Sequence, residues 1–338
     1  MANDVSNKCP EGTRPIEAGV FRMGIEDVIY DQYEAHDVDV SAFCMAEHET
    51  TNKEYYDFLR KQQGPQPKFD LVAVTREGSF FELIDKGDDF QLLKVSPFIS
   101  GRVTPNSLYS GYLVIPHQTP SLKLPSPEGE FDGPNQPVVN VAWDQADAYC
   151  RAQGGRLPTE AEWEKAARGG NGYRYGTNDG TLSRANAVYA VEKTADVCSK
   201  PKNPYGLCDM SGNAHEWAQD WFSFSSYKAG YTDSRMTHAA PKDPQGPSQP
   251  NKKEKIETRK VVRGGSFRDG RKPDKTIREM NDRLAATFRG SYDPTNRESY
   301  LGIDESFGFR CAFPVKKDPT HRAPMPESDK PAKPRRKK

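Results

Sequence analysis

The chain has 338 residues, of which 35% are hydrophobic, and its mean hydropathy is −0.86. This length allows one large domain or two ordinary ones, and 27 glycines with 27 prolines favour a loop-rich fold over a helix bundle. The 48 basic residues balance the 48 acidic residues, so the net charge gives no reason to expect nucleic acid or an anionic membrane as a partner. No run of about 18 apolar residues is present, so the sequence predicts no membrane-spanning segment.

The N-terminal part of the chain predicts strands followed by a helix. Residues 10–24 alternate short apolar pieces with glycine and proline, which is typical of a strand or hairpin near a sheet edge. Residues 38–49 alternate well enough to form a second strand. Thr51 and Glu54 have the spacing of a capping box, and apolar residues follow them at helical spacing, so an amphipathic helix is expected there.

Residues 63–137 are rich in proline, glycine and serine but contain two strand-like runs, DLVAV and SFFELI. We interpret this stretch as an insertion that carries a hairpin, within a single domain that spans residues 1–314. The insertion is either a decorated surface loop or a lobe that binds a partner or substrate. Residues 315–338 are charged, end in KPRRKK, and are expected to form a disordered tail.

Two helices are predicted in the middle of the chain. The run DQADAYCRAQ places Ala146, Tyr149 and Cys150 on one helical face and is followed by a glycine pair, which is typical of a helix end. Thr159 and Glu162 then form a second capping box, and another glycine pair closes the helix that it opens.

The six cysteines form no C-x-x-C motif and have no histidine partner at zinc-finger spacing, so thiolate binding of a metal is not expected. Disulfides are one interpretation of the even number, and buried core thiols are the other. The start of the chain, MANDVSNKCP, lacks the apolar segment of a secretory signal. The chain is therefore expected to be either cytosolic or a mature form without its signal.

Four segments in order resemble the formylglycine-generating-enzyme and sulfatase-modifying-factor family. They are GGRLPTEAEWEKAARGG at 154–170, NPYGLCDMSGNAHEWAQDWF at 203–222, VVRGGSFRDG at 261–270 and GFRCAF at 308–313. The resemblance covers nearly the whole chain. It implies an α+β fold that is rich in loops, has little regular secondary structure and is distantly similar to C-type lectins.

With this resemblance, disulfides become the favoured interpretation of the cysteines. The three expected pairs are Cys150 with Cys311, Cys198 with Cys208, and Cys9 with Cys44. The resemblance implies the first pair, because the corresponding cysteines of the enzymes are bonded. Spacing across a proline-rich turn predicts the second, and two N-terminal strands that are expected to pair predict the third. Full pairing implies an oxidising compartment, so a periplasmic or secreted location is expected.

The resemblance also implies a calcium site between residues 209 and 216. Its ligands would be the side chains of Asp209 and Glu216 and the carbonyl oxygens of Gly212 and Ala214. Hard oxygen ligands from a short loop suit calcium, which accepts irregular geometry. The alternative is a turn in which Asp209 caps a helix and the second carboxylate is solvated. A second calcium loop of the enzymes is shortened here and is not carried over.

The segment after the Gly-Gly-Ser motif departs from the family. The oxygen-dependent enzymes have a cysteine pair there that binds copper and reacts with a substrate cysteine, because soft thiolates hold Cu(I). In this chain Asp269 stands where the first cysteine belongs, and no cysteine occurs between 209 and 310. His215 replaces the expected tryptophan, while Ser266 is retained. Formylglycine formation by the known route is therefore not expected.

The pocket candidates are His215, Ser266, Asp269 and Arg310, with Arg263, Arg268, Arg283 and Arg289 nearby. They either form a buried hydrogen-bond network that supports loops or hold a redox metal such as non-haem iron. The H-x-x-x-H-x-E arrangement of the sulfoxide-synthase branch is absent from the sequence. We expect a module that binds a protein or peptide-like ligand in the family's substrate groove. The alternative is an oxidase or other modifying enzyme that uses a different metal in the same pocket.

Overall fold

The computed structural model describes residues 9–25, 35–63, 69–74, 80–85, 90–95, 112–116, 131, 133–223, 240–247, 249, 258–270, 282–294 and 306–316. The tail expected at 315–338 lies outside these ranges from position 317 on, as do the connections within the expected insertion. Within these ranges no helix combines the length and the apolar character that crossing a bilayer requires.

The strands nearest the two ends of the domain share one sheet. β1 (Thr13–Ile16) and β13 (Ala312–Pro314) both pair antiparallel with β4 (Phe43–Ala46), which lies between them. β2 (Gly19–Met23) and β3 (His36–Val40) form a separate antiparallel pair. The stretch at 10–24, predicted as a strand or hairpin, contains two strands that do not pair with each other, and the stretch at 38–49, predicted as one strand, contains β4 and part of β3.

Three helices are described: α1 (Asn52–Gln63), α2 (Trp143–Ala152) and α3 (Glu160–Ala167). Both predicted capping boxes are present, Thr51 with Glu54 before α1 and Thr159 with Glu162 before α3. In each box the threonine hydroxyl accepts from the glutamate amide at 3.2 Å, and the glutamate carboxylate accepts from the threonine amide at 2.8 Å. Each pair of bonds satisfies backbone donors that the first helical turn leaves open.

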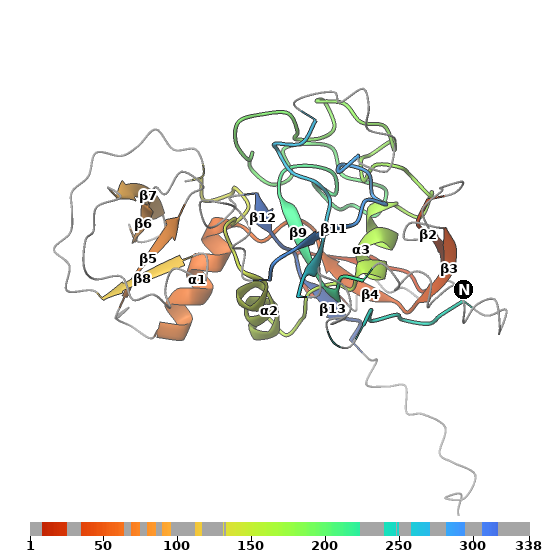
Figure 1. Ribbon diagram of the computed structural model, residues 1–338, viewed down its shortest axis with the longest axis horizontal. Coiled ribbons are helices and arrows are strands. Elements are labelled where there is room, and N and C mark those ends of the chain that lie inside the picture. The colour runs from red at the N-terminus through yellow and green to blue at the C-terminus, as the bar shows by residue number, and fades with distance from the viewer. Residues whose placement is uncertain are drawn as a thin grey trace, which may run out of the picture.

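The insertion contains a four-stranded antiparallel sheet in the order β7-β6-β5-β8. Its strands are β5 (Phe69–Val74), β6 (Phe80–Asp85), β7 (Phe90–Val95) and β8 (Tyr112–Pro116). The predicted hairpin corresponds to β5 and β6, while β7 and β8 were not predicted. In Figure 1 this sheet lies beside α1, at the end of the molecule opposite β2 and β3.

The sheet that carries the site has the order β11-β10-β9-β12. Its strands are β9 (His215–Trp221), β10 (Lys260–Arg263), β11 (Gly290–Tyr292) and β12 (Phe307–Gly308). β12 runs parallel to β9, and the other pairs are antiparallel. The loops between α3 and β9, green in Figure 1, form a layer above this sheet.

α3 lies at the centre of the fold, because all eight of its residues are buried. One apolar cluster joins Trp163 and Ala166 of α3 to the N-terminal strands. A second cluster packs residues of α1 and α2 against Trp217 of β9 and Phe309. Val262 of β10 belongs to the second cluster as well, so this cluster fixes the positions of β9 and β10.

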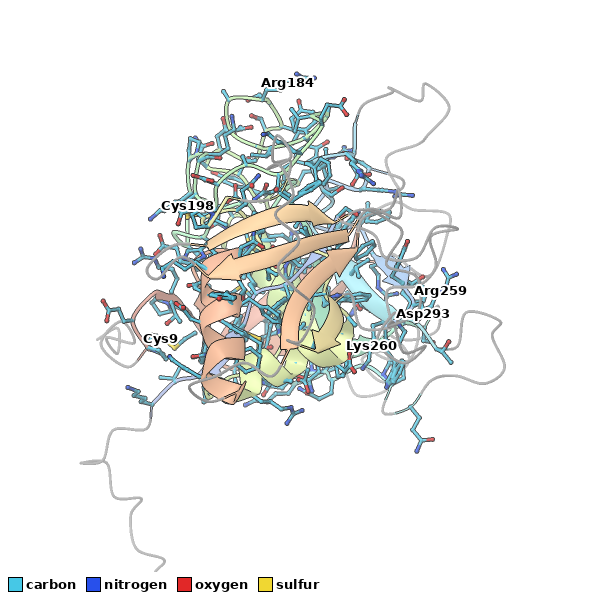
Figure 2. The ribbon with its side chains drawn as sticks, turned by 90° about the vertical axis from the view of Figure 1, so that its left-hand side faces the viewer. Cys9, Arg184, Cys198, Arg259, Lys260 and Asp293 are labelled. Atoms are coloured by element: carbon cyan, nitrogen blue, oxygen red, sulfur yellow. A yellow bond between two sulfur atoms is a disulfide. The ribbon has the colours of Figure 1, made fainter. Side chains whose placement is uncertain are left out.

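All six cysteines form the three expected disulfides. The Cα atoms are 5.6 Å apart in Cys9–Cys44, 5.5 Å apart in Cys150–Cys311 and 5.0 Å apart in Cys198–Cys208, all within the range that the bond allows. Figure 2 shows Cys9 and Cys198 on one side of the molecule and Lys260 on the other. The bonds enclose 35, 161 and 10 residues respectively, so they constrain the unfolded chain unequally.

We predict that replacing both members of Cys150–Cys311 by alanine destabilises the protein more than replacing both members of Cys198–Cys208. The loop-closure relation gives about 5 kcal/mol for the long loop and about 3 kcal/mol for the short one. Urea unfolding of the two double variants measures the difference. Equal losses would show that native-state contacts of the sulfurs, rather than loop entropy, determine the effect.

Candidate functional site

The candidate site begins where β9 and β10 bring two segments of the chain together. His215 is the first residue of β9, and its amide donates to Ser306 O at 2.7 Å. Its ring stacks on Phe307 of β12, with the ring centroids 5.0 Å apart. Backbone pairing and ring stacking therefore fix the position of the imidazole.

Asp269 reaches the imidazole, and Ser266 reaches Asp269, because the chain turns sharply after β10. Gly264 and Gly265 have φ angles of 88° and 70°, in the left-handed region that side chains disfavour. A Cβ on Gly265 would lie 2.7 Å from the carbonyl oxygen of Arg283, so this turn also packs too closely for any other residue. The two glycines of the Gly-Gly-Ser motif are therefore required by the backbone geometry, whatever chemistry the site performs.

Within this turn the Asp269 carboxylate is the common partner of Ser266 and His215. Its Oδ2 accepts from the Ser266 amide at 2.8 Å and from the Ser266 hydroxyl at 3.1 Å. His215 Nε2 lies 3.3 Å from the same oxygen, and all three residues are largely buried. Because the carboxylate is in the middle, this arrangement differs from a serine–histidine–carboxylate relay, which has the histidine in the middle.

The arginines near the site have different partners. Arg283 Nη1 lies 3.7 Å from Asp269 Oδ1, and the guanidinium of Arg268 lies over the Phe267 ring. Arg263 and Arg289 are buried against the carboxylates of α3. Arg310, which was predicted as a pocket residue, instead binds Glu216 and is fully buried. The structure therefore brings His215, Ser266 and Asp269 together and places Arg310 beside the predicted calcium ligands.

Copper-dependent thiol oxidation needs a free thiol. None is present, because every cysteine of the chain is disulfide-bonded. In the described part of the chain, one group of three or more metal-ligating side chains lies close enough to share an ion. It consists of Glu47 and the bonded sulfurs of Cys198 and Cys208. His215 and Asp269 offer two protein ligands, one fewer than the histidine–histidine–carboxylate set of a non-haem iron site.

The predicted calcium ligands belong to a buried acidic cluster. Glu216 Oε2 accepts from Trp163 Nε1 and Arg310 Nε, both at 2.7 Å, and Oε1 accepts from Arg310 Nη2 at 2.7 Å. Asp209 Oδ2 accepts from the Cys198 amide at 2.7 Å. Asp209 Oδ1 is buried and has no hydrogen-bond partner among the described residues, which is costly unless a cation or water binds it.

Glu49 is a third carboxylate of this cluster, and the sequence analysis did not identify it. Its oxygens accept from the Ala214 amide at 2.8 Å and from Asn213 Nδ2 at 2.7 Å, which holds the predicted calcium loop in place. Burial raises the pKa of Glu49 well above its ordinary value, and Asp209 and Glu216 add to this effect. In the sequence, Glu49 stands two positions before the Thr51 capping box, which marks the start of a helix. Nothing in the sequence indicates its long-range partners.

The acidic cluster contains more carboxyl groups than cations. The pKa of Asp209 is raised to about 6, chiefly by burial and in part by the nearby Glu216 carboxylate, against the opposing effects of the Cys198 amide and Arg310. Three carboxylates thus share one buried guanidinium. A bound cation would satisfy the unpartnered Asp209 oxygen and offset this charge imbalance. Of the two Glu216 oxygens, Oε2 accepts two hydrogen bonds and Oε1 accepts one from Arg310, so Oε1 has more capacity for a further partner.

Asp220, near the end of β9, is a further buried carboxylate that the sequence analysis missed. Its Oδ2 accepts from the Glu160 amide at 2.8 Å, at the start of α3. The pKa of Asp220 is raised to about 7, chiefly by burial and in part by the Glu160 and Glu162 carboxylates, against the opposing effects of the Glu160 amide and Arg289. The Lys260 ammonium lies between the rings of Trp143 and Trp221, and burial lowers its pKa to about 8 against the opposing effect of the Asp220 carboxylate.

We predict that Asp220 makes the protein less stable as the pH rises from about 4 to about 7. The folded state keeps this proton while the unfolded state, with an ordinary pKa near 4, loses it, so the free energy of unfolding falls across this window. Asp220→Asn should remove the dependence and gain on the order of 1–4 kcal/mol relative to wild type between the two pH values. Urea unfolding at each pH measures this gain, and Asp37→Asn, at an exposed aspartate, is the control. A parallel pH profile for wild type and Asp220→Asn would contradict the prediction.

Comparison with known proteins gives the same family for nearly the whole chain. Residues 2–314 match the profile of the sulfatase-modifying factor enzyme 1-like domain. The formylglycine-generating enzyme of Streptomyces coelicolor is 41% identical over 195 residues, which are 53% of this chain and 53% of that enzyme.

A longer match is to a protein of Chlamydia caviae that is named serine/threonine-protein kinase pkn1. It is 30% identical over 302 residues, which are 89% of this chain and 38% of that protein. The chain thus spans less than half the length of this relative.

Among solved structures, Treponema denticola variable protein 1 superposes with a TM-score of 0.53 at 21% identity, covering 89% of this chain and 94% of that one. The expected fold, loop-rich α+β and similar to formylglycine-generating enzymes, is confirmed.

Proposed function

Because the chain belongs to the sulfatase-modifying factor enzyme 1-like family, we propose that it binds a protein or peptide-like ligand in the groove that the enzymes of this family use for substrate. The observation that carries this proposal is the replacement of thiol chemistry by a polar set. Every cysteine is bonded to another, and Asp269, which contacts His215 and Ser266, stands where the family resemblance places the first cysteine of the reactive pair.

The polar set suits binding because it is already organised. Two bonds from Ser266 and the contact with His215 hold the carboxylate in one orientation, so a ligand would find an acceptor that needs little rearrangement. The location that we propose is extracytoplasmic, periplasmic or secreted. Support comes from the three disulfides, which use all six cysteines and persist in oxidising compartments.

The second candidate is an oxidase or other modifying enzyme that uses a different metal in the same pocket. The distance of 3.3 Å between His215 Nε2 and Asp269 Oδ2 favours it, since one ion could replace this contact and bind both groups. It is the weaker candidate because the described residues supply no third protein ligand there. Stoichiometric iron or copper in protein purified without added metal would favour this candidate over binding alone.

Selection of a displayed peptide library on the immobilised protein tests the proposed binding. Peptides enriched on wild type should lose at least about tenfold in affinity on Asp269→Asn and on His215→Gln, because each change removes a charge or hydrogen bond from a partly buried site. Asp37→Asn, which changes an exposed carboxylate of β3, should bind them like wild type.

Two results would contradict the binding proposal. One is enriched peptides that bind all four proteins equally, which would place the ligand elsewhere. The other is copper-dependent conversion of cysteine to formylglycine in a sulfatase-type peptide, which would mean that the reaction does not need the missing thiols.

We further propose calcium as a bound ion, with Asp209, Glu216 and the carbonyl oxygens of Gly212 and Ala214 as its ligands. The buried, unpartnered Oδ1 of Asp209 and the excess negative charge around it support the proposal. When bound, calcium would supply positive charge to this loop and no redox chemistry.

Calcium should raise the melting temperature of wild type, and a chelator should lower it, because an ion that binds only the folded state stabilises it by about 2.7 kcal/mol at a hundredfold excess over Kd. Asp209→Asn should abolish this response, and Asp37→Asn should retain it. Differential scanning calorimetry with calcium and with chelator measures the shift. An unchanged melting temperature of wild type in chelator would mean that calcium is not bound.

A further inference from the structure

We infer that the ligand of this site presents a cationic group to Asp269 Oδ1, and that the Arg283 guanidinium occupies the position of this group in the ligand-free protein. The inference rests on the proposed binding function and adds the chemical class of the ligand, a basic side chain or an amine.

The two oxygens of Asp269 have different surroundings. Oδ2 accepts from the Ser266 amide at 2.8 Å and from the Ser266 hydroxyl at 3.1 Å, and His215 Nε2 lies 3.3 Å from it. Oδ1 accepts no hydrogen bond from the described residues, and its nearest cation is Arg283 Nη1 at 3.7 Å. A carboxylate oxygen can accept about two hydrogen bonds, so Oδ1 keeps its capacity for a donor from outside.

The Arg283 contact is easily displaced. Its side chain is 60% exposed, and 3.7 Å is longer than a hydrogen bond. Exposed ion pairs of this kind contribute little to stability, because water screens the two charges. Asp269 itself is only 14% exposed, so a cation that binds Oδ1 directly from the ligand would interact in a less solvated environment than Arg283 does.

The charge of the site favours a cation over an anion. An anionic ligand group at Oδ1 would be repelled by the carboxylate, and among the described residues the cation paired with that oxygen is the exposed Arg283. A cationic ligand would instead replace Arg283 and complete the hydrogen bonding of Oδ1, with charge-assisted bonds that are stronger than neutral ones. The two ligand classes therefore predict opposite effects of removing the Arg283 charge.

Three capped peptides, acetyl-Gly-Gly-Xaa-Gly-Gly-amide with lysine, norleucine or glutamate as Xaa, serve as probes for NMR titration. Wild type should prefer the lysine peptide to the norleucine peptide, which has the same length but no charge. Arg283→Gln should raise the affinity for the lysine peptide several-fold, because it removes the competing cation. Asp269→Asn should abolish the preference for lysine, and Arg283→Lys should bind like wild type.

Arg151→Gln is the matched control, since Arg151 is also an exposed arginine that pairs with a carboxylate, on α2. It should leave all three affinities unchanged. A glutamate preference that Arg283→Gln weakens would overturn the inference, as would equal binding of the three probes or no binding up to about 10 mM.

The library selection distinguishes failure of this inference from failure of the proposed function. Enriched peptides that need His215 but contain no basic group would reject the cationic ligand and keep the binding site. Enriched peptides that are insensitive to His215→Gln and Asp269→Asn would reject the site itself.

Discussion

The fold depends on the neutralisation of α3, a helix that is buried on every side and carries three glutamates. Glu160 binds Arg289 and Arg263, and Glu164 binds Arg263 at 2.6 Å and the Gly24 amide at 2.8 Å. Arg263 has no exposed surface, so these charges are desolvated. Removing one partner of such a pair leaves an uncompensated buried charge, which costs about 3–5 kcal/mol. The N-terminal segment, β10 and the loop before β11 are thereby attached to one helix.

The same buried ion pairs position the candidate site. Arg263 is the last residue of β10 and immediately precedes the glycine turn that leads to Ser266 and Asp269. Glu216 follows His215 in β9 and is held by Arg310. Each half of the site is therefore adjacent in sequence to a residue that a buried ion pair fixes. This arrangement lets the chemistry of the site vary while its geometry is retained, because the residues that bind are not the residues that hold the backbone.

Local signals in the sequence predicted the helices well, because a capping box such as Thr159 with Glu162 uses partners three residues apart. The segment motifs gave the family and, through it, the cysteine pairing. The long-range partners could not be predicted: Glu49 contacts the backbone of Ala214, 165 positions away, and no local pattern encodes this. His215 and Glu216 were expected in a loop and lie at the start of β9, because pairing with β10 and β12 decides their conformation. Convergence of His215 with Asp269 follows from that pairing.

The placement of β1, β4 and β13 in one sheet determines how the domain responds to mechanical force. Since β1 and β13 are both antiparallel to β4, they run parallel to each other. The Cys9–Cys44 bond carries tension past β1, so force applied through the two ends of the domain reaches β4 at Cys44 and its antiparallel neighbour β13. The disulfides Cys9–Cys44 and Cys150–Cys311 carry the tension past the loops of 35 and 161 residues that they close. Most of the domain, including both halves of the site, is therefore mechanically shielded, and the insertion between Cys44 and Cys150 is where the chain can lengthen under load.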